Sequence, residues 1–507
     1  MAGSVADPVA DSVAGAGPGR PCSPRTVPTD MLWQRTALEL GALIRRREVR
    51  AVEVLEAILE RVDAVNPVLN AIVTLDVEGA RAAAEAADAA VRRGEAVGPL
   101  HGVPVTIKDL TETKGLRTTY GSSFFADYVP TEDAILVERL RAAGCPVLGK
   151  TNTPEFGGRF DTENAVFGAT RNPWHRAHSP GGSSGGAAAQ VAAGMGPLAQ
   201  GNDGGGSIRV PAACCGVFGL KPQYGRIPFW PRQDSWIAHV HEGPIARSVR
   251  DAAAMLDVMA GPDLRDPRCL PAPPGSFLAA CDGEIRGLRI AWSPTPGYGD
   301  VEPAVRACCE AALSAFEDLG AHVEDVRLDL SDAERVYVGT ILPRLKAQFD
   351  RDLPGGYAEK VDPGMAAFLP MVEAMTMLEV VEAEFGLYAL WDRLAALFRR
   401  YDLLLLPTMA TPAHRSGQFG PEAINGRPVD TPLTPLFTYP FNLTGQPAAS
   451  VPAGFTEGGL PVGLQLVARR FDEATLLRAA ARFEEARPWA HRWPDLPPAA
   501  NPAPATN

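Results

Sequence analysis

Long apolar runs are missing from this sequence: no stretch approaches the roughly eighteen consecutive apolar residues that a membrane-spanning helix requires. The N-terminus also lacks the basic segment followed by an apolar segment that marks a secretory signal peptide. Cysteine is scarce, with 8 residues among 507, and no pair has CxxC spacing or a histidine at zinc-ligand spacing. These absences predict a cytoplasmic protein that has no membrane contact, no structural metal and reduced cysteines.

Positive charge is also in short supply, with 48 Lys and Arg against 60 Asp and Glu and a formal net charge of -12. Binding to a phosphate backbone requires clustered Lys and Arg. The short basic run at residues 45–47 lies among Glu residues in a helical stretch, which is typical of a solvated helix face. We therefore expect no nucleic-acid partner.

Both ends of the chain, residues 1–30 and 496–507, are dominated by small residues and proline. Such segments bury too little surface to offset the entropy of ordering, so we expect disordered tails. Between them the composition is typical of a globular protein, with 46% hydrophobic and 21% charged residues over the whole chain. Order should begin near Thr36, which forms a capping-box pattern with Glu39. We expect one domain spanning residues 31–495.

Apolar runs and amphipathic stretches alternate along this domain. Helical patterns cover residues 51–64, 77–93, 133–143, 303–319 and 371–401, and short apolar runs cover residues 69–75, 103–107, 146–148, 288–292, 323–326, 403–407, 449–452 and 463–467. Alternation of this kind is typical of an α/β fold. We predict a single large domain with a central mixed β-sheet covered by helices on both faces. Residues 330–400 should form a helical excursion that shapes the substrate pocket.

Glycine is densest in two short segments, GGSSGG at residues 181–186 and GNDGGGS at residues 201–207. Each opens a predicted helix. Because glycine tolerates backbone angles that other residues resist, successive N–H groups can converge on one point and bind an anion. Neither segment is a phosphate-binding loop, a dinucleotide fingerprint or a GxSxG elbow. Two such loops, each ending near serines, indicate a catalytic site rather than a linker.

A serine hydroxyl needs a base to become a nucleophile. No histidine has a motif context that recommends it, although His101 and His178 lie near the glycine segments. Lys108 follows the apolar run at residues 103–107, which would bury its amine. A desolvated lysine can lose its proton near neutral pH and act as a base. The alternative, a lysine paired with Asp109 at a strand end, is favoured by the strand alone.

The motifs together resemble those of the amidase signature family of serine hydrolases. The matching segments are residues 102–104 (GVP), 108–109 (KD), 149–152 (GKTN), 155–156 (EF), 172–174 (NPW), 179–186 (SPGGSSGG), 203–209 (DGGGSIR) and 219–222 (GLKP). The resemblance is densest between residues 100 and 225, and the flanking elements follow the family's layout over most of the chain.

This resemblance implies an α/β amidase fold and a Ser-Ser-Lys triad. Ser207 would attack the carbonyl, and Ser183 would pass its proton to the neutral amine of Lys108. The resemblance also places an unusual cis peptide bond directly after Ser183. The backbone N–H groups expected to form the oxyanion hole are those of Gly204, Gly205, Gly206 and Ser207. The residues expected to support these loops are Ser184, Asp203 and Arg209.

The sequence departs from the family pattern beside the proposed nucleophile. Asn202 stands where the family more often has Thr, and Gly204 where it often has a larger residue. The extra space predicts tolerance of bulky or aromatic substrates, and greater flexibility of the loop explains such tolerance equally well. The aromatic residues near the motifs, each more typical of core than of a substrate contact, are Tyr120, Phe124, Phe125, Phe156, Trp230 and Trp236.

The predicted function is hydrolysis of carboxylic amides, with aryl or alkyl amides favoured over carbamates and esters. The expected partner is a small-molecule amide, no metal or organic cofactor is required, and a homodimer is compatible with the sequence. Two alternatives stay open. One is the ammonia-producing component of an amidotransferase, which takes ammonia from glutamine for transamidation on transfer RNA, and the other is a catalytically silent binding homologue.

Overall fold

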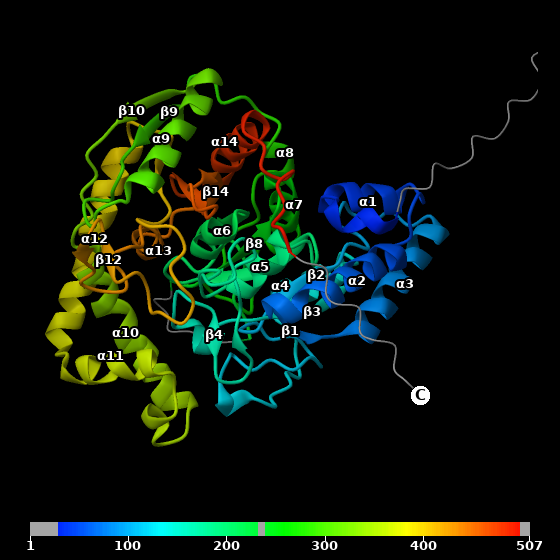
Figure 1. Cartoon of the computed structure of the whole chain (residues 1–507), viewed down its shortest axis with the longest axis horizontal. Helices are drawn as coiled ribbons and strands as arrows, with labels where there is room; N and C mark the ends of the chain where they lie inside the picture. Colours follow the sequence, from blue (N-terminus) through cyan, green and yellow to red (C-terminus); the bar gives the residue numbers. More distant parts are fainter. Residues whose placement is uncertain (1–28, 232–238, 497–507) are drawn as a thin grey trace, which may run out of the picture.

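The computed structural model describes residues 29–231 and 239–496, so the predicted tails lie almost wholly outside the described residues (Figure 1). An 11-stranded sheet runs through the domain in the order β1-β3-β2-β6-β8-β7-β14-β15-β11-β9-β10. These strands are β1 (Ile72–Leu75), β2 (Val105–Lys108), β3 (Val147–Thr151), β6 (Leu198–Asp203), β7 (Phe218–Lys221), β8 (His241–Ala246), β9 (Arg289–Trp292), β10 (His322–Asp325), β11 (Leu403–Pro407), β14 (Ala448–Phe455) and β15 (Pro461–Ala468).

The sheet is mixed, as the sequence predicts. Strand β2 pairs in parallel with β3 and β6, and β9 pairs in parallel with β10 and β11. The antiparallel pairs join β1 to β3, β6 to β8, β8 to β7, β7 to β14, β14 to β15 and β15 to β11. Two small hairpins lie outside the sheet, β4 (Glu163–Asn164) with β5 (Gly168–Ala169) and β12 (Ala423–Ile424) with β13 (Arg427–Pro428).

Helices flank the sheet and complete a single α/β domain (Figure 1). Their bounds are α1 (Ala37–Arg45), α2 (Ala51–Leu69), α3 (Val77–Arg93), α4 (Ile135–Ala142), α5 (Gly185–Ala192), α6 (Arg209–Cys215), α7 (Val249–Met259), α8 (Phe277–Ala280), α9 (Pro303–Asp318), α10 (Ala333–Asp352), α11 (Pro363–Ala374), α12 (Met377–Phe398), α13 (Pro440–Leu443) and α14 (Glu473–Ala486). Short 3-10 turns are η1 (Thr29–Gln34), η2 (Ser123–Phe125), η3 (Glu155–Gly157) and η4 (Tyr357–Glu359).

The predicted capping box at the start of α1 is present, since Thr36 and Glu39 exchange hydrogen bonds. The predicted end of the next helix is wrong: α2 continues through Pro67 to Leu69. Pro67 lies in the last turn, where its missing N–H removes one helical hydrogen bond. Helix α2 ends where Asn66 Oδ1 accepts the N–H groups of Ala71 and Ile72.

The predicted helical excursion consists of α10, α11 and α12, which form the side of the molecule opposite α1 to α3 in Figure 1. The sequence predicts one helical pattern at residues 371–401, but two helices meet there. The break falls at Thr376, which caps α12 in a capping box with Glu379. Within the described ranges, no single helix is both long and apolar enough to cross a bilayer; α11 and α12 reach that length and composition only together, as a pair bent by 106°.

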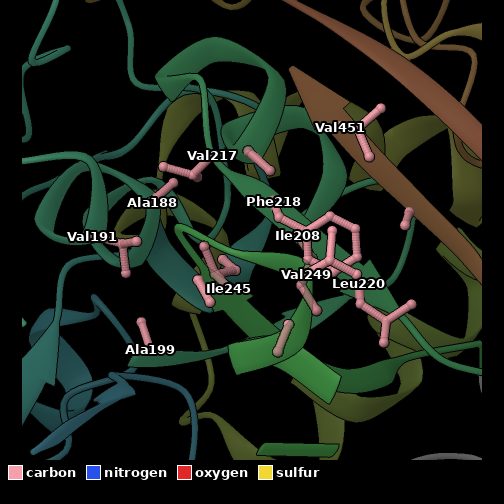
Figure 2. Close-up of a cluster of buried hydrophobic side chains, with 14 of the residues drawn as sticks. Ala188, Val191, Ala199, Ile208, Val217, Phe218, Leu220, Ile245, Val249 and Val451 are labelled. Carbon is pink, nitrogen blue, oxygen red and sulfur yellow. The ribbon is translucent and has the colours of Figure 1, made fainter. Parts of the chain in front are cut away.

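A cluster of buried apolar side chains includes Ile208, the residue that follows the second glycine segment (Figure 2). Ile208, which follows Ser207 in the chain, is fully buried in it with Phe218 from β7 and Ile245 from β8. Burial of each such side chain stabilises the fold by about 1.5–3 kcal/mol. The segment that carries Ser207 is therefore fixed against the sheet by its own neighbour.

Candidate active site

Lys108 ends β2, and every residue of that strand is buried. Its Nζ lies 2.7 Å from Ser183 Oγ, 2.9 Å from Ser184 Oγ and 2.7 Å from Asn202 Oδ1, with the side chain fully buried. Asn202 belongs to β6, which pairs with β2, and Ser183 and Ser184 lie just before α5, so the amine meets residues from both of these neighbouring segments. The structure thus brings together Lys108 and Ser183, as the sequence predicts.

The alternative pairing of Lys108 with Asp109 is not what the geometry favours. The Asp109 carboxylate accepts the Thr119 hydroxyl at 2.5 Å and the Thr119 N–H at 3.1 and 3.2 Å. Burial raises the pKa of Asp109. This carboxylate therefore serves the loop that follows β2.

Ser183 lies in the first glycine segment, directly before α5. The cis peptide bond joins Gly182 to Ser183, so it precedes Ser183 instead of following it. A Cβ on Gly182 would approach the carbonyl oxygens of Asp161 and Arg159 to 2.7 and 2.8 Å, so only glycine fits there. The next N–H, of Ser184, donates to the carbonyl of Ser207 at 3.0 Å. The two glycine segments are thereby joined at the serines.

Asp203 organises the second glycine segment between β6 and α6. Its carboxylate accepts the N–H groups of Gly206 at 2.8 Å and Ile208 at 3.1 Å, and it pairs with the Arg209 guanidinium at 2.8 Å. Both side chains of this ion pair are fully buried. Burial alone would raise the pKa of Asp203, but Arg209 outweighs it and holds that pKa well below its usual range.

Three residues far along the chain hold the same segment, and the sequence does not predict them. Asn442 donates to the Asp203 carbonyl and carboxylate, each at 2.8 Å. The Thr438 hydroxyl donates to the Gly205 carbonyl at 2.6 Å, and the Tyr337 hydroxyl donates to the Gly204 carbonyl at 3.4 Å. None of the three lies in a motif, so no local signal marks them.

The four N–H groups expected to form the oxyanion hole are not equivalent. Gly206 N–H is already bonded to Asp203. In the described part of the chain, the N–H groups of Gly204, Gly205 and Ser207 donate no hydrogen bond. These three groups are therefore available to a ligand, and the Gly206 N–H instead holds the loop.

The site opens into a cavity of about 470 Å³. The candidate catalytic residues Ser183 and Ser207 line it together with Asn202, Gly204 and Gly205. Its remaining walls come mainly from apolar residues of α10 and α11, including Val338, Ile341, Leu342, Leu345, Met365, Phe368 and Met371. Ser183 and Ser207 both line the cavity, but within the described residues their hydroxyls are not hydrogen-bonded to each other.

The histidines noted in the sequence lie elsewhere. His101 Nε2 is 3.1 Å from the Ala87 carbonyl, and the His178 ring packs against His175. His239, which the sequence does not single out, lines the cavity.

Of the aromatic candidates, Phe156 lines the cavity, Trp230 lines a separate small one, and Trp236 lies outside the described residues. No three His, Cys, Asp or Glu side chains in residues 29–231 and 239–496 are grouped to hold a metal.

A family model described as "Amidase" matches residues 53–477. The chain is 43% identical over 461 residues to an acylamidase of Rhodococcus erythropolis, covering 90% of this chain and 97% of the relative. The chain belongs to the amidase signature family. It is also 39% identical to a glutamyl-tRNA(Gln) amidotransferase component of Roseiflexus sp. (strain RS-1), covering 92% of this chain and 99% of the relative.

A solved structure agrees with the assignment of this chain to the amidase signature family. A bacterial aryl acylamidase of the amidase signature family superposes with a TM-score of 0.84 at 32% identity, covering 90% of this chain and 97% of that chain. The predicted α/β fold is confirmed by this likeness and by the observed sheet. The protein is an enzyme that hydrolyses amides.

Proposed function

We propose that this amidase cleaves its substrate through an acyl-enzyme on Ser207, with Ser183 as proton relay and Lys108 as base. One observation carries the proposal: the fully buried Lys108 amine lies 2.7 Å from Ser183 Oγ, at the end of a cavity that Ser183 and Ser207 share. Ser207 Oγ attacks the carbonyl carbon and the proton moves through Ser183 to Lys108. The same proton then reaches the leaving amine, and water releases the carboxylic acid.

The contacts of Lys108 suit a neutral amine. A neutral amine has two N–H donors and one lone pair, and the Asn202 amide oxygen can only accept. One of the two serine hydroxyls can accept the second N–H of the amine. The lone pair of the amine is then left to accept the O–H of the other serine. When Ser183 donates to Lys108, its oxygen is free to accept the proton of Ser207. Hydrogen bonds of this kind are often long in unliganded enzymes and shorten when substrate binds.

The oxyanion of the tetrahedral intermediate would be held by the N–H groups of Gly204, Gly205 and Ser207. All three belong to residues that line the cavity, and within the described chain none of these groups is bonded to protein. Loss of one donor of this type typically lowers kcat by about 10²- to 10³-fold. Ser184, Asp203 and Arg209 support these groups without touching the substrate.

The proposed substrates are amides of aryl or alkyl amines, and carbamates and esters are secondary candidates. The predominantly apolar walls of the cavity favour an apolar acyl or amine group. The similarity to an acylamidase and to an aryl acylamidase supports this class.

The amidotransferase alternative is supported by the similarity to the glutamyl-tRNA(Gln) amidotransferase component. Glutamine carries an α-carboxylate that needs a cation, and the cavity contains Arg159 and Arg344. However, Arg159 is paired with Asp362 at 3.0 Å and Arg344 with Glu384 at 2.6 Å. The cavity therefore favours an apolar amide over glutamine. Glutaminase activity and co-purifying partner proteins would support the alternative.

Labelling with a fluorophosphonate tests the nucleophile. We expect labelling of the wild-type protein at Ser207, no labelling of Ser207→Ala, and normal labelling of Ser331→Ala, whose serine is exposed just before α10. A panel of anilides, alkyl amides, carbamates and esters then ranks the substrates. A folded wild-type protein that is neither labelled nor active would instead be the silent binding homologue.

We also propose a cytoplasmic location, which the seven free cysteines of the described chain support.

A further inference from the structure

A second cavity, of about 300 Å³, adjoins the active-site cavity. Phe156 and Gln348 line both cavities, so their side chains form the wall between them. We call the second cavity the aromatic annex. Its apolar lining consists of Tyr120, Phe125, Tyr128, Phe156, Phe349 and Leu353. Nothing in the proposed chemistry at Ser207 uses this space.

The rings of the annex meet both edge-to-face and stacked, since Tyr120 and Tyr128 stack at 6.0 Å and 20° while other pairs stand at steep angles. Phe125 meets Tyr120 at 5.0 Å and 84°, and it meets Phe156 at 6.2 Å and 89°. The wall therefore presents both ring faces and ring edges. Aromatic rings prefer edge-to-face or offset contacts, because the face is negative and the edge positive. Such a wall is complementary to another aromatic ring.

The backbone of the annex is unusual at two bulky residues. Tyr120 has φ of 55° and Phe156 has φ of 50°, both in the left-handed region that favours glycine. The two residues are joined directly, since Phe156 N–H donates to the Tyr120 carbonyl at 2.8 Å. Aromatic side chains held this way cost free energy, and such residues cluster at ligand clamps and active sites. The strain here falls on Phe156, which belongs to the dividing wall, and on its hydrogen-bond partner Tyr120, which lines the annex.

The annex is also connected to the catalytic segments. Tyr120 N–H donates to the carbonyl of Asp109 at 3.0 Å, and Asp109 follows Lys108. On the other side, a Cβ on Gly157 would lie 3.2 Å from Ser183 Oγ, so the residue after Phe156 borders the proposed relay. A group that enters the annex therefore lies beside the catalytic segments and not at a remote surface.

We propose that the aromatic annex is a second substrate subsite, which binds an aromatic ring at the end of the substrate remote from the scissile amide. The inference rests on the proposed function and adds a substrate class to it, elongated amides with a distal aryl group. An aryl group fits better than an ammonium group, because the acid at the rim, Asp352, is paired with Arg351 at 2.6 Å. The other nearby acid, Glu112, accepts the hydroxyl of Tyr120.

The test compares a one-ring anilide, acetanilide, with two-ring amides that carry a phenyl group on a four-atom linker, placed on the acyl or on the amine side. The measured quantity is the ratio of kcat/KM for the better two-ring amide to kcat/KM for acetanilide. We expect Phe125→Ala and Tyr128→Ala each to lower this ratio by about five- to tenfold, mainly through KM for the two-ring amide. Tyr128 is 39% exposed, so its variant should fold. Phe385→Ala on α12, 69% exposed and outside both cavities, is the matched control and should leave the ratio unchanged.

A binding measurement separates this inference from the proposed mechanism. Calorimetry on the full-length Ser207→Ala protein should give about five- to tenfold weaker Kd for the two-ring amide when Phe125→Ala is added. If the wild type hydrolyses none of the amides, the proposed function fails, whereas the annex is still judged by these Kd values. An unchanged Kd and an unchanged ratio would overturn the annex. Preference for an analogue with trimethylammonium in place of the distal ring, lost in Tyr128→Ala, would overturn its assignment to aryl groups.

Discussion

The hydroxyl of Thr438 donates a 2.6 Å hydrogen bond to the carbonyl of Gly205, 233 residues away in the chain. The other edge of the same peptide group, Gly206 N–H, donates to the Asp203 carboxylate at 2.8 Å. The peptide between Gly205 and Gly206 is therefore held on both sides. Its orientation determines the direction of the neighbouring N–H groups, including that of Ser207, which we assign to the oxyanion hole.

Replacing Thr438 with Val should slow the chemical step while the protein stays folded. Val has nearly the same shape but cannot donate to Gly205, so the peptide between Gly205 and Gly206 loses one of its two restraints. We expect kcat to fall roughly tenfold, less than the 10²- to 10³-fold typical of losing an oxyanion donor, with little change in KM. Thr438→Ser keeps the hydroxyl and should retain most of the activity. Equal kcat values for Val and Ser variants would contradict this role.

Lys108→Ala should remove most turnover without unfolding the protein. A positioned base typically contributes about 10²- to 10⁴-fold, and the relay has no other acceptor in our proposal. In the wild type, activity should rise with pH as this amine loses its proton, and the rise should vanish from any residual activity of the variant. Steady-state kinetics from about pH 6 to 10, with circular dichroism to check folding, measure both effects. Full activity in Lys108→Ala would rule out the assigned base.

Asp203→Asn should destabilise the fold as well as the site. The change leaves the Arg209 guanidinium buried without its counter-charge, and breaking a buried pair in this way typically costs about 3–5 kcal/mol. Urea unfolding measures the loss. The matched control is Glu310→Gln, which removes an ion pair with Arg306 at 2.7 Å whose side chains are 55% and 43% exposed. That pair should change stability by less than about 1 kcal/mol.

The sequence could single out the residues that we propose for the chemistry because they lie in short, recognisable segments. Lys108, Ser183 and Ser207 each lie within or at the end of a motif. Lys108 ends β2, Ser183 precedes α5 and Ser207 follows β6, and β2 and β6 are neighbours in the sheet. The supports of the loop could not be predicted. Tyr337 and Thr438 reach Gly204 and Gly205 from elements more than a hundred residues away, and a single hydroxyl on a helix or loop carries no pattern.

The sheet shows the same limit. The sequence predicts most strands from apolar runs, but β8 reads HEGPIA and resembles a loop, since it has both Gly243 and Pro244. Pro is unfavourable inside a sheet because it cannot donate to the ladder. Strand β8 forms because β6 and β7 pair with it on either side. Tertiary pairing here outweighs the local preference, and a single sequence does not contain that information.

The buried carboxyl group of Asp251 should make stability depend on pH. It is 1% exposed and accepts the N–H groups of Ala37 at 2.9 Å and Leu38 at 3.0 Å at the start of α1. Burial raises the pKa of Asp251 to about 6, from 3.8. The unfolded chain therefore releases this proton at lower pH than the folded protein does. The folded state loses stability as the pH rises from about 4 to 6, by about 1.4 kcal/mol for each pH unit.

The Asp251→Asn variant isolates this effect, because Asn does not titrate and keeps one acceptor oxygen for the α1 N–H groups. As the pH rises from about 4 to 6, the free energy of unfolding of the variant minus that of the wild type should increase by about 3 kcal/mol in total. Urea denaturation at half-unit pH steps measures this difference, which removes the contribution of titrating groups that do not interact with Asp251. Asp318→Asn, at an exposed position at the end of α9, should track the wild type across the same range. A constant difference between Asp251→Asn and the wild type would mean that this carboxyl group titrates alike in the folded and unfolded chains.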